Sequence, residues 1–112
     1  MTQASTVFPY EQLLDFTTAI FASMGCNGND ARIAAVTLLS ADLRGIDSHG
    51  VARLSGYARL QEAGRANPKP NMRIIHETPS TAVVDGDSGL GLVVAPFAMQ
   101  VAIAKAEKVG TG

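Results

Sequence analysis

The chain has 112 residues, 46% of them hydrophobic, and a formal net charge of −1 at pH 7. This length allows one small domain with a modest core. The near-zero charge argues against nucleic acid or an anionic membrane as a partner. The single cysteine, Cys26, excludes an internal disulfide, and the absence of a Cys/His cluster argues against a metal site.

The chain start lacks the basic residues and apolar stretch of a secretory leader. The most apolar run, residues 90–99, is interrupted by glycine and proline and is too short to span a bilayer. These two features predict a cytoplasmic protein with no membrane partner.

Three helices are predicted in the first part of the chain. The first ends at Gly25, the second is capped by Asn29 or Asp30, and the third covers about residues 48–63. Apolar residues at three- and four-residue steps define the expected inner faces. These faces consist of Leu13, Phe16, Ile20 and Met24, then Ile33, Val36, Leu39 and Leu43, then Val51, Leu54 and Ala58.

Polar groups suited to chemistry gather between the second and third helices, in residues 44–53. Gly45 can adopt the left-handed conformation that ends a helix, and Ser48 is a good N-cap for the next helix. His49 would then lie in the first turn, beside unpaired backbone N–H groups, with Arg53 on the same face. A proton carrier beside a planar cation suits a substrate whose carboxylate is held while a neighbouring oxygen gains or loses a proton. The plainer alternative is that the Ser-His-Gly sequence only caps a helix.

The character of the chain changes after the third helix. Residues 67–71, Asn-Pro-Lys-Pro-Asn, predict a stiff and extended linker. We therefore expect two parts, a helical segment over residues 1–66 and the start of a mixed α/β domain over residues 67–112.

In the second part, two strands are predicted before a last helix. Residues 73–76 and 81–84 are short β-branched runs separated by turn residues, which is typical of a hairpin or a strand-loop-strand unit. A glycine-rich loop follows at residues 85–91, and a fourth helix is expected over about residues 96–109. Three helices, a strand pair, a glycine-rich loop and a fourth helix together indicate an α+β fold.

Residues 41–54 closely resemble the active-site segment of the type-2 malate/L-lactate dehydrogenase family, whose members are NAD(P)-dependent oxidoreductases. The resemblance runs from about residue 10 to the end of the chain. It implies that His49 gives a proton to the substrate oxygen during reduction and that Ser48 takes part in the same relay. It also implies that Arg53 holds the substrate carboxylate.

Members of that family are several times longer than this chain, so the resemblance implies the N-terminal fragment of a larger, non-Rossmann dehydrogenase fold. The cofactor, NAD or NADP, would bind mostly to residues beyond this chain, and its binding residues are unknown from this sequence. The implied substrate is a small-molecule carboxylate, a malate- or lactate-like 2-hydroxy acid or its 2-keto acid. The full-length protein is expected to be a homodimer, and the fragment alone is expected to be inactive.

Two competing hypotheses remain open. The order of strand, glycine loop and helix could indicate a Rossmann dinucleotide site, but residues 86–91 read G-x-x-G-x-G instead of G-x-G-x-x-G. Glu107, the acidic residue at about the right distance, falls inside a predicted helix. A tight turn with closely packed backbone explains these glycines better. The second hypothesis is a non-catalytic helical interaction or dimerisation module.

Overall fold

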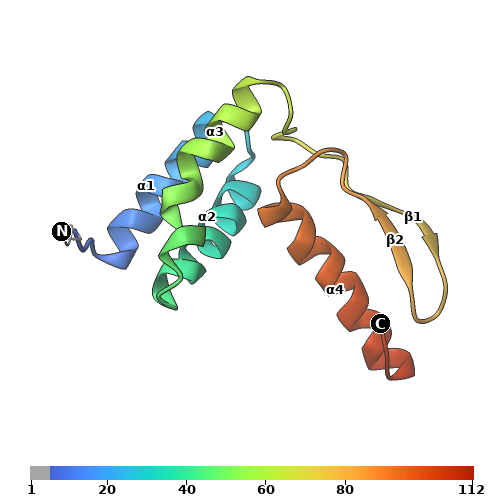
Figure 1. Ribbon diagram of the computed structural model, residues 1–112. Coiled ribbons are helices and arrows are strands. Elements are labelled where there is room, and N and C mark those ends of the chain that lie inside the picture. Colours follow the sequence, from blue (N-terminus) through green and yellow to red (C-terminus); the bar gives the residue numbers. More distant parts are fainter. Residues whose placement is uncertain (1–5) are drawn as a thin grey trace.

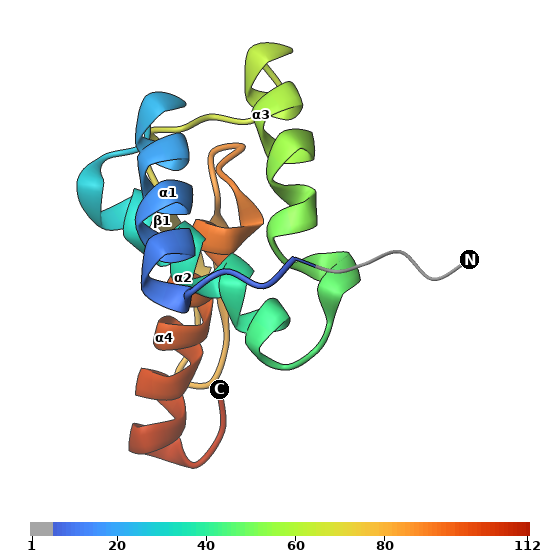
Figure 2. The same ribbon diagram turned by 90° about the vertical axis from the view of Figure 1, so that its left-hand side faces the viewer.

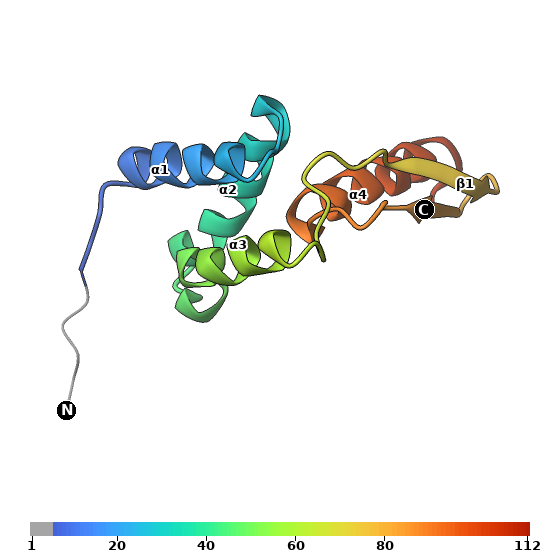
Figure 3. The same cartoon turned by 90° about the horizontal axis from the view of Figure 1, so that it is seen from above.

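The computed structural model describes residues 6–112. The prediction that the chain start is no secretory leader falls largely on residues 1–5, which lie outside the described residues. Three helices gather at one end of the molecule, and a hairpin and a fourth helix form the other (Figure 1). Seen from above, this arrangement is elongated (Figure 3), with extents of 52 × 31 × 26 Å. The predicted α+β fold is confirmed. The elements are α1 (Tyr10–Ser23), α2 (Gly28–Leu43), the 3-10 turns η1 (Asp47–His49) and η2 (Val51–Arg53), α3 (Leu54–Glu62), β1 (Arg73–Glu77), β2 (Ala82–Asp85) and α4 (Gly91–Val109).

Each of the first three helices ends at a glycine with a left-handed backbone. The φ angles of Gly25, Gly45 and Gly64 are 105°, 75° and 71°. At the end of α2, the N–H groups of Gly45 and Ile46 donate to carbonyls of the last helical turn, at 3.0 and 2.8 Å. This pairing satisfies backbone acceptors that a helix end leaves free, and a side chain would strain the glycine. All three predicted helix ends are confirmed.

The core lies between α1 and α2, and the predicted inner faces are partly confirmed, because Leu39 and Met24 are buried. Val36 and Leu43, which were expected inside, are 40% and 66% exposed, and Phe16 of α1 is 55% exposed. Small side chains allow two helices to approach closely, so alanines take the place of the larger residues at the contact. The buried residues of the two helices are Leu14, Thr17 and Phe21 in α1, and Ala31, Ala34, Ala35, Leu38 and Leu39 in α2.

The N-terminus of α2 also differs from the prediction. Asn27, and neither Asn29 nor Asp30, is the N-cap, because its side chain accepts the backbone N–H of Asp30 at 2.8 Å. The neighbouring Cys26 is a buried free thiol. Burial, assisted by the negative charge of Asp30, raises the pKa of this thiol.

A buried hydroxyl in α1 provides a test of the core. Thr17 is fully buried, and its Oγ1 has no hydrogen-bond partner among the described residues. Because an unpaired buried hydroxyl is costly, Thr17→Val should raise the free energy of unfolding by about 1 kcal/mol in urea denaturation. Ser23→Ala is the control, since Ser23 is exposed, and should change stability by less than about 0.5 kcal/mol. A destabilised Thr17→Val variant would contradict this expectation.

The strands form the predicted hairpin, and the last helix starts earlier than expected. β1 and β2 pair antiparallel, with Arg73 opposite Asp85. The fourth helix begins at Gly91, and Pro96 lies inside it. Leu90 and Val93 are buried in the core, so packing against the other helices outweighs the hydrogen bond that the proline cannot donate. No helix within residues 6–112 is long and apolar enough to cross a membrane.

Two carboxylates organise the loop before α4, and one of them, Asp87, ties it to the linker. Asp85 accepts the backbone N–H of Asp87 at 2.9 Å and pairs with Arg73 at 3.3 Å, and these contacts lower its pKa. Asp87, whose φ is 52°, accepts the backbone N–H of Asn71 at 2.8 Å and the side-chain amide of Asn67 at 3.1 Å. These bonds hold the extended linker against the loop.

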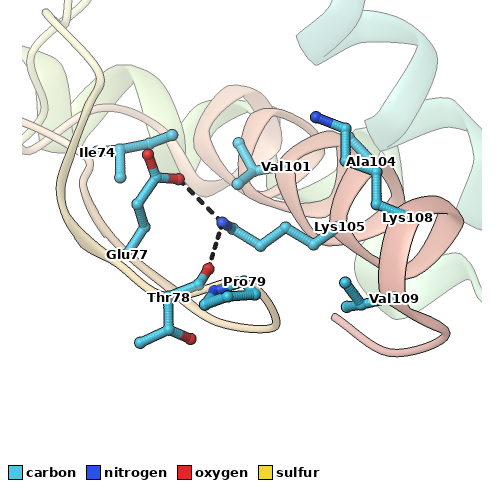
Figure 4. Close-up of a pocket in the computed structure, with 9 residues that line it drawn as sticks. All are labelled: Ile74, Glu77, Thr78, Pro79, Val101, Ala104, Lys105, Lys108 and Val109. Atoms are coloured by element: carbon cyan, nitrogen blue, oxygen red, sulfur yellow. Dashed lines mark hydrogen bonds and ion pairs between the residues drawn. The ribbon is translucent and has the colours of Figure 1, made fainter.

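A groove of about 580 Å³ separates the hairpin from α4 (Figure 4). Its central cation, Lys105, donates to a Glu77 carboxylate oxygen at 2.9 Å and to the Thr78 carbonyl at 2.7 Å. Both contacts join α4 to the tip of the hairpin. The charge of Lys105 therefore serves to hold the hairpin, and the groove is not the candidate site.

Candidate active site

The connection between α2 and α3 is two short 3-10 turns, which corrects the prediction of a helix starting at Ser48. Figure 2 shows this connection, in green, turning from the end of α2 into α3. Gly50 separates the turns with a backbone outside the helical region, at φ −99° and ψ −141°. Ser48 therefore caps no helix, and the His49 N–H is not unpaired, because it donates to the Ile46 carbonyl at 3.1 Å. The regular helix begins at Leu54.

His49 and Arg53 nevertheless lie together, as predicted. Both line an open hollow of about 300 Å³, whose other walls come from α3. The side chains of both residues are exposed, so a small molecule can reach them. Gly56, Tyr57 and Leu60 complete the lining.

Ser48 and His49 are hydrogen-bonded through their side chains. Ser48 Oγ and His49 Nδ1 are 2.8 Å apart, and the direction of the bond depends on the histidine tautomer. When the neutral ring donates Nδ1–H to the hydroxyl, Nε2 is free to act as a base. Once Nε2 has taken up a proton, the ring is an imidazolium that still donates Nδ1–H to the hydroxyl and can act as an acid through Nε2–H. One serine can therefore support proton transfer in both directions.

Arg53 is held by the backbone of the first turn. Its Nε donates to the Ser48 carbonyl at 2.8 Å. Among the described residues, no hydrogen bond uses its two terminal nitrogens, which leaves them available to a ligand. A planar guanidinium with free N–H groups suits a carboxylate, which can accept two parallel hydrogen bonds.

The wall formed by α3 is fixed by an aromatic contact with the core. The rings of Tyr57 and buried Phe21 are tilted by 54° with centroids 6.3 Å apart. Leu54, one turn earlier, is buried in the same core. Tyr57 thus lines the same hollow as His49 and Arg53.

Asp42 of α2 contacts the segment that carries the candidate site, and no sequence motif predicted this contact. Its carboxylate Oδ2 accepts the backbone N–H of Val51 at 2.8 Å, although the two residues are nine positions apart. A signal was available, because a carboxylate in the last turn of a helix faces the negative end of the helix dipole. Such a residue is disfavoured there unless it has a partner.

The glycine-rich loop does not fit a dinucleotide. A Cβ on Gly86 would come within 2.8 Å of a Val94 methyl, and one on Gly89 would come equally close to Pro70. The glycines therefore allow close packing within the protein and leave no open cradle of N–H groups for a pyrophosphate. The Rossmann alternative is wrong, and the tight-turn interpretation is confirmed.

Comparison with known proteins decides the family. A family model described as malate/L-lactate dehydrogenase matches residues 8–112. The chain belongs to the malate/L-lactate dehydrogenase family. The L-sulfolactate dehydrogenase of Methanocaldococcus jannaschii is 45% identical over 93 residues, which cover 83% of this chain and 27% of that protein. The malate dehydrogenase of Pyrococcus abyssi is 45% identical over 104 residues, which cover 93% of this chain and 29% of that protein.

The fold also matches that of a solved structure from a malate dehydrogenase. The malate dehydrogenase of Pyrococcus horikoshii superimposes with a TM-score of 0.88 at 40% identity, over 98% of this chain and 33% of that one. The chain thus spans only 27% to 33% of the length of these relatives. The resemblance inferred from residues 41–54 is confirmed.

Proposed function

We propose that this chain is the N-terminal part of an NAD(P)-dependent oxidoreductase that interconverts a 2-hydroxy acid and its 2-keto acid. The observation that carries the proposal is the hollow shared by His49 and Arg53, with Ser48 bonded to the histidine ring. Membership of the malate/L-lactate dehydrogenase family supports the same reaction class.

The roles of the three side chains follow from their chemistry. Arg53 binds the substrate carboxylate through its terminal nitrogens, which orients the neighbouring C2 oxygen toward His49. In the oxidative direction, His49 Nε2 removes the hydroxyl proton while Nδ1–H donates to Ser48. In the reductive direction, the doubly protonated ring gives its Nε2 proton to the oxygen while its Nδ1–H donates to Ser48.

Hydride transfer at C2 of the substrate would be supplied by a bound nicotinamide cofactor. We propose NAD or NADP for this role, because the relatives are dehydrogenases of hydroxy acids. The residues described here offer it no cradle, since the glycine-rich loop is covered by Val94 and Pro70. The nicotinamide-binding residues therefore belong, in this proposal, to a part of the enzyme outside residues 6–112.

The direct test is an assay of the full-length enzyme with L-malate, L-lactate and L-sulfolactate, each with NAD⁺ and NADP⁺. At least one acid should reduce the nicotinamide, and its amide, which lacks the carboxylate, should react far more slowly. Failure of every acid with both cofactors would contradict the proposed function.

The isolated 112-residue chain should show no dehydrogenase activity and should bind NADH no more tightly than in the millimolar range. The reason is that hydride transfer needs a nicotinamide held against the substrate carbon, and the described residues supply only a proton relay and an anion clamp. Titration with NADH, followed by nicotinamide fluorescence, measures this affinity. Saturable micromolar binding would contradict our placement of the cofactor.

We further propose that the full-length enzyme is a cytoplasmic homodimer in which residues 1–66 form a helical segment separate from the cofactor-binding domain. Exposed apolar side chains are available to meet either the rest of the full-length chain or a second subunit. They include Phe8, Leu43 and Ile46, which are 58%, 66% and 49% exposed. Sedimentation of the full-length enzyme measures its oligomeric state.

A further inference from the structure

We infer that Asp42 is a positioning residue of the proposed active site. Its carboxylate holds the junction between η1 and η2 and thereby sets the spacing between His49 and Arg53. The inference rests on the proposed function, because it gives a role in that site to a residue of α2 that does not line the hollow.

The first contact joins Asp42 to the start of the second turn. Val51 is the first residue of η2, and its N–H is one of the donors that a helix start leaves unpaired. The partly buried Asp42 carboxylate accepts this N–H at 2.8 Å. The Asp42 carboxylate therefore acts as an N-cap for η2, although it belongs to a different helix, α2.

The second contact explains why a glycine separates the two turns. Gly50 is buried, and a Cβ at this position would overlap the carboxylate carbon and both oxygens of Asp42. The Asp42 carboxylate therefore leaves no space for a side chain at position 50. The carboxylate occupies the volume that a side chain would otherwise fill, so Asp42 and Gly50 are a matched pair.

The junction controls the direction of Arg53. The backbone N–H of Arg53 donates to the Gly50 carbonyl at 2.9 Å, and its Nε donates to the Ser48 carbonyl at 2.8 Å. Any shift of the junction therefore moves the guanidinium relative to His49. Misplacement by about 1 Å can lower the rate of an enzyme by ~10²-fold.

Two substitutions in the full-length enzyme distinguish the hydrogen-bond acceptor of Asp42 from its negative charge. Asp42→Leu has a similar size but no acceptor, and it should lower kcat/KM by ~10²-fold with a raised KM, because Arg53 is displaced. Asp42→Asn keeps an oxygen acceptor and should retain most of the activity. Asp15→Leu is the matched control, since Asp15 is exposed on α1, and should leave the kinetics unchanged. An active Asp42→Leu variant, or an Asp42→Asn variant equally impaired, would overturn the inference.

NMR of the same full-length variants tests the inference without turnover. The ring signals of His49 and the Nε–H signal of Arg53 should move in Asp42→Leu and stay close to wild type in Asp42→Asn. Unmoved signals in Asp42→Leu would overturn the inference. If the wild-type enzyme oxidises no hydroxy acid, the proposed function fails, and these signals still decide whether Asp42 positions the two side chains.

A double-mutant cycle tests the matched pair in case a single variant folds poorly. Gly50→Ala should markedly lower the urea midpoint of the wild type, because its Cβ meets the carboxylate. On an Asp42→Ala background the same change should cost much less, since the space is then empty. Additive effects of the two changes would show that the residues do not share this space and would overturn the inference.

Discussion

Replacing His49 by glutamine in the full-length enzyme should lower kcat by roughly 10²-fold or more, the usual scale of general acid–base catalysis. Glutamine preserves hydrogen-bonding capacity but cannot carry a proton between substrate and solvent at neutral pH. KM should change less, because the substrate carboxylate is bound by Arg53 in the proposed site. Steady-state kinetics with the hydroxy acid and with the keto acid measure both constants.

The chain contains a matched control for this substitution. His76 is an exposed histidine on β1 that does not line the hollow. His76→Gln removes the same functional group and should leave kcat and KM unchanged. Near-normal turnover of His49→Gln would assign the proton transfer to another group.

Replacing Arg53 by lysine should weaken substrate binding by about 1.5–3 kcal/mol, the range for a charge-assisted hydrogen bond. The planar guanidinium is anchored through Nε to the Ser48 carbonyl, which leaves its terminal nitrogens in a fixed plane. A lysine ammonium carries the same charge but cannot make the anchoring bond and a two-point carboxylate contact together. The loss should appear mainly as a raised KM for the acid.

Arg59 provides the comparison for Arg53. It is an exposed arginine of α3 outside the hollow, so Arg59→Lys should leave KM unchanged. The amide of the substrate should gain little from wild-type Arg53. Equal turnover of the acid and its amide would give Arg53 a purely structural role.

The sequence by itself determined the features that depend on local chemistry. Gly25, Gly45 and Gly64 end helices because a left-handed residue closes the last turn, whatever the rest of the fold. The β-branched runs form a hairpin because turn residues separate them. Residues 41–54 were sufficient to indicate the family, since that motif carries its own specificity.

Only the tertiary structure decided which surfaces meet. Alanines of α2 face α1 because close helix packing selects small side chains, and no periodicity distinguishes them from the larger Val36 and Leu43. α4 begins before its proline because Leu90 and Val93 pack in a core formed by residues far away in the sequence.

Tertiary contacts also decided the geometry of the candidate site. The spacing of His49 and Arg53 suggested one continuous helix, but the chain there forms two turns, and Arg53 is aimed by a bond to the backbone carbonyl of Ser48. What divides the turns is the contact of Asp42 with the Gly50–Val51 segment. A local pattern places residues on an element, whereas contacts between elements determine how that element is bent and where its side chains point.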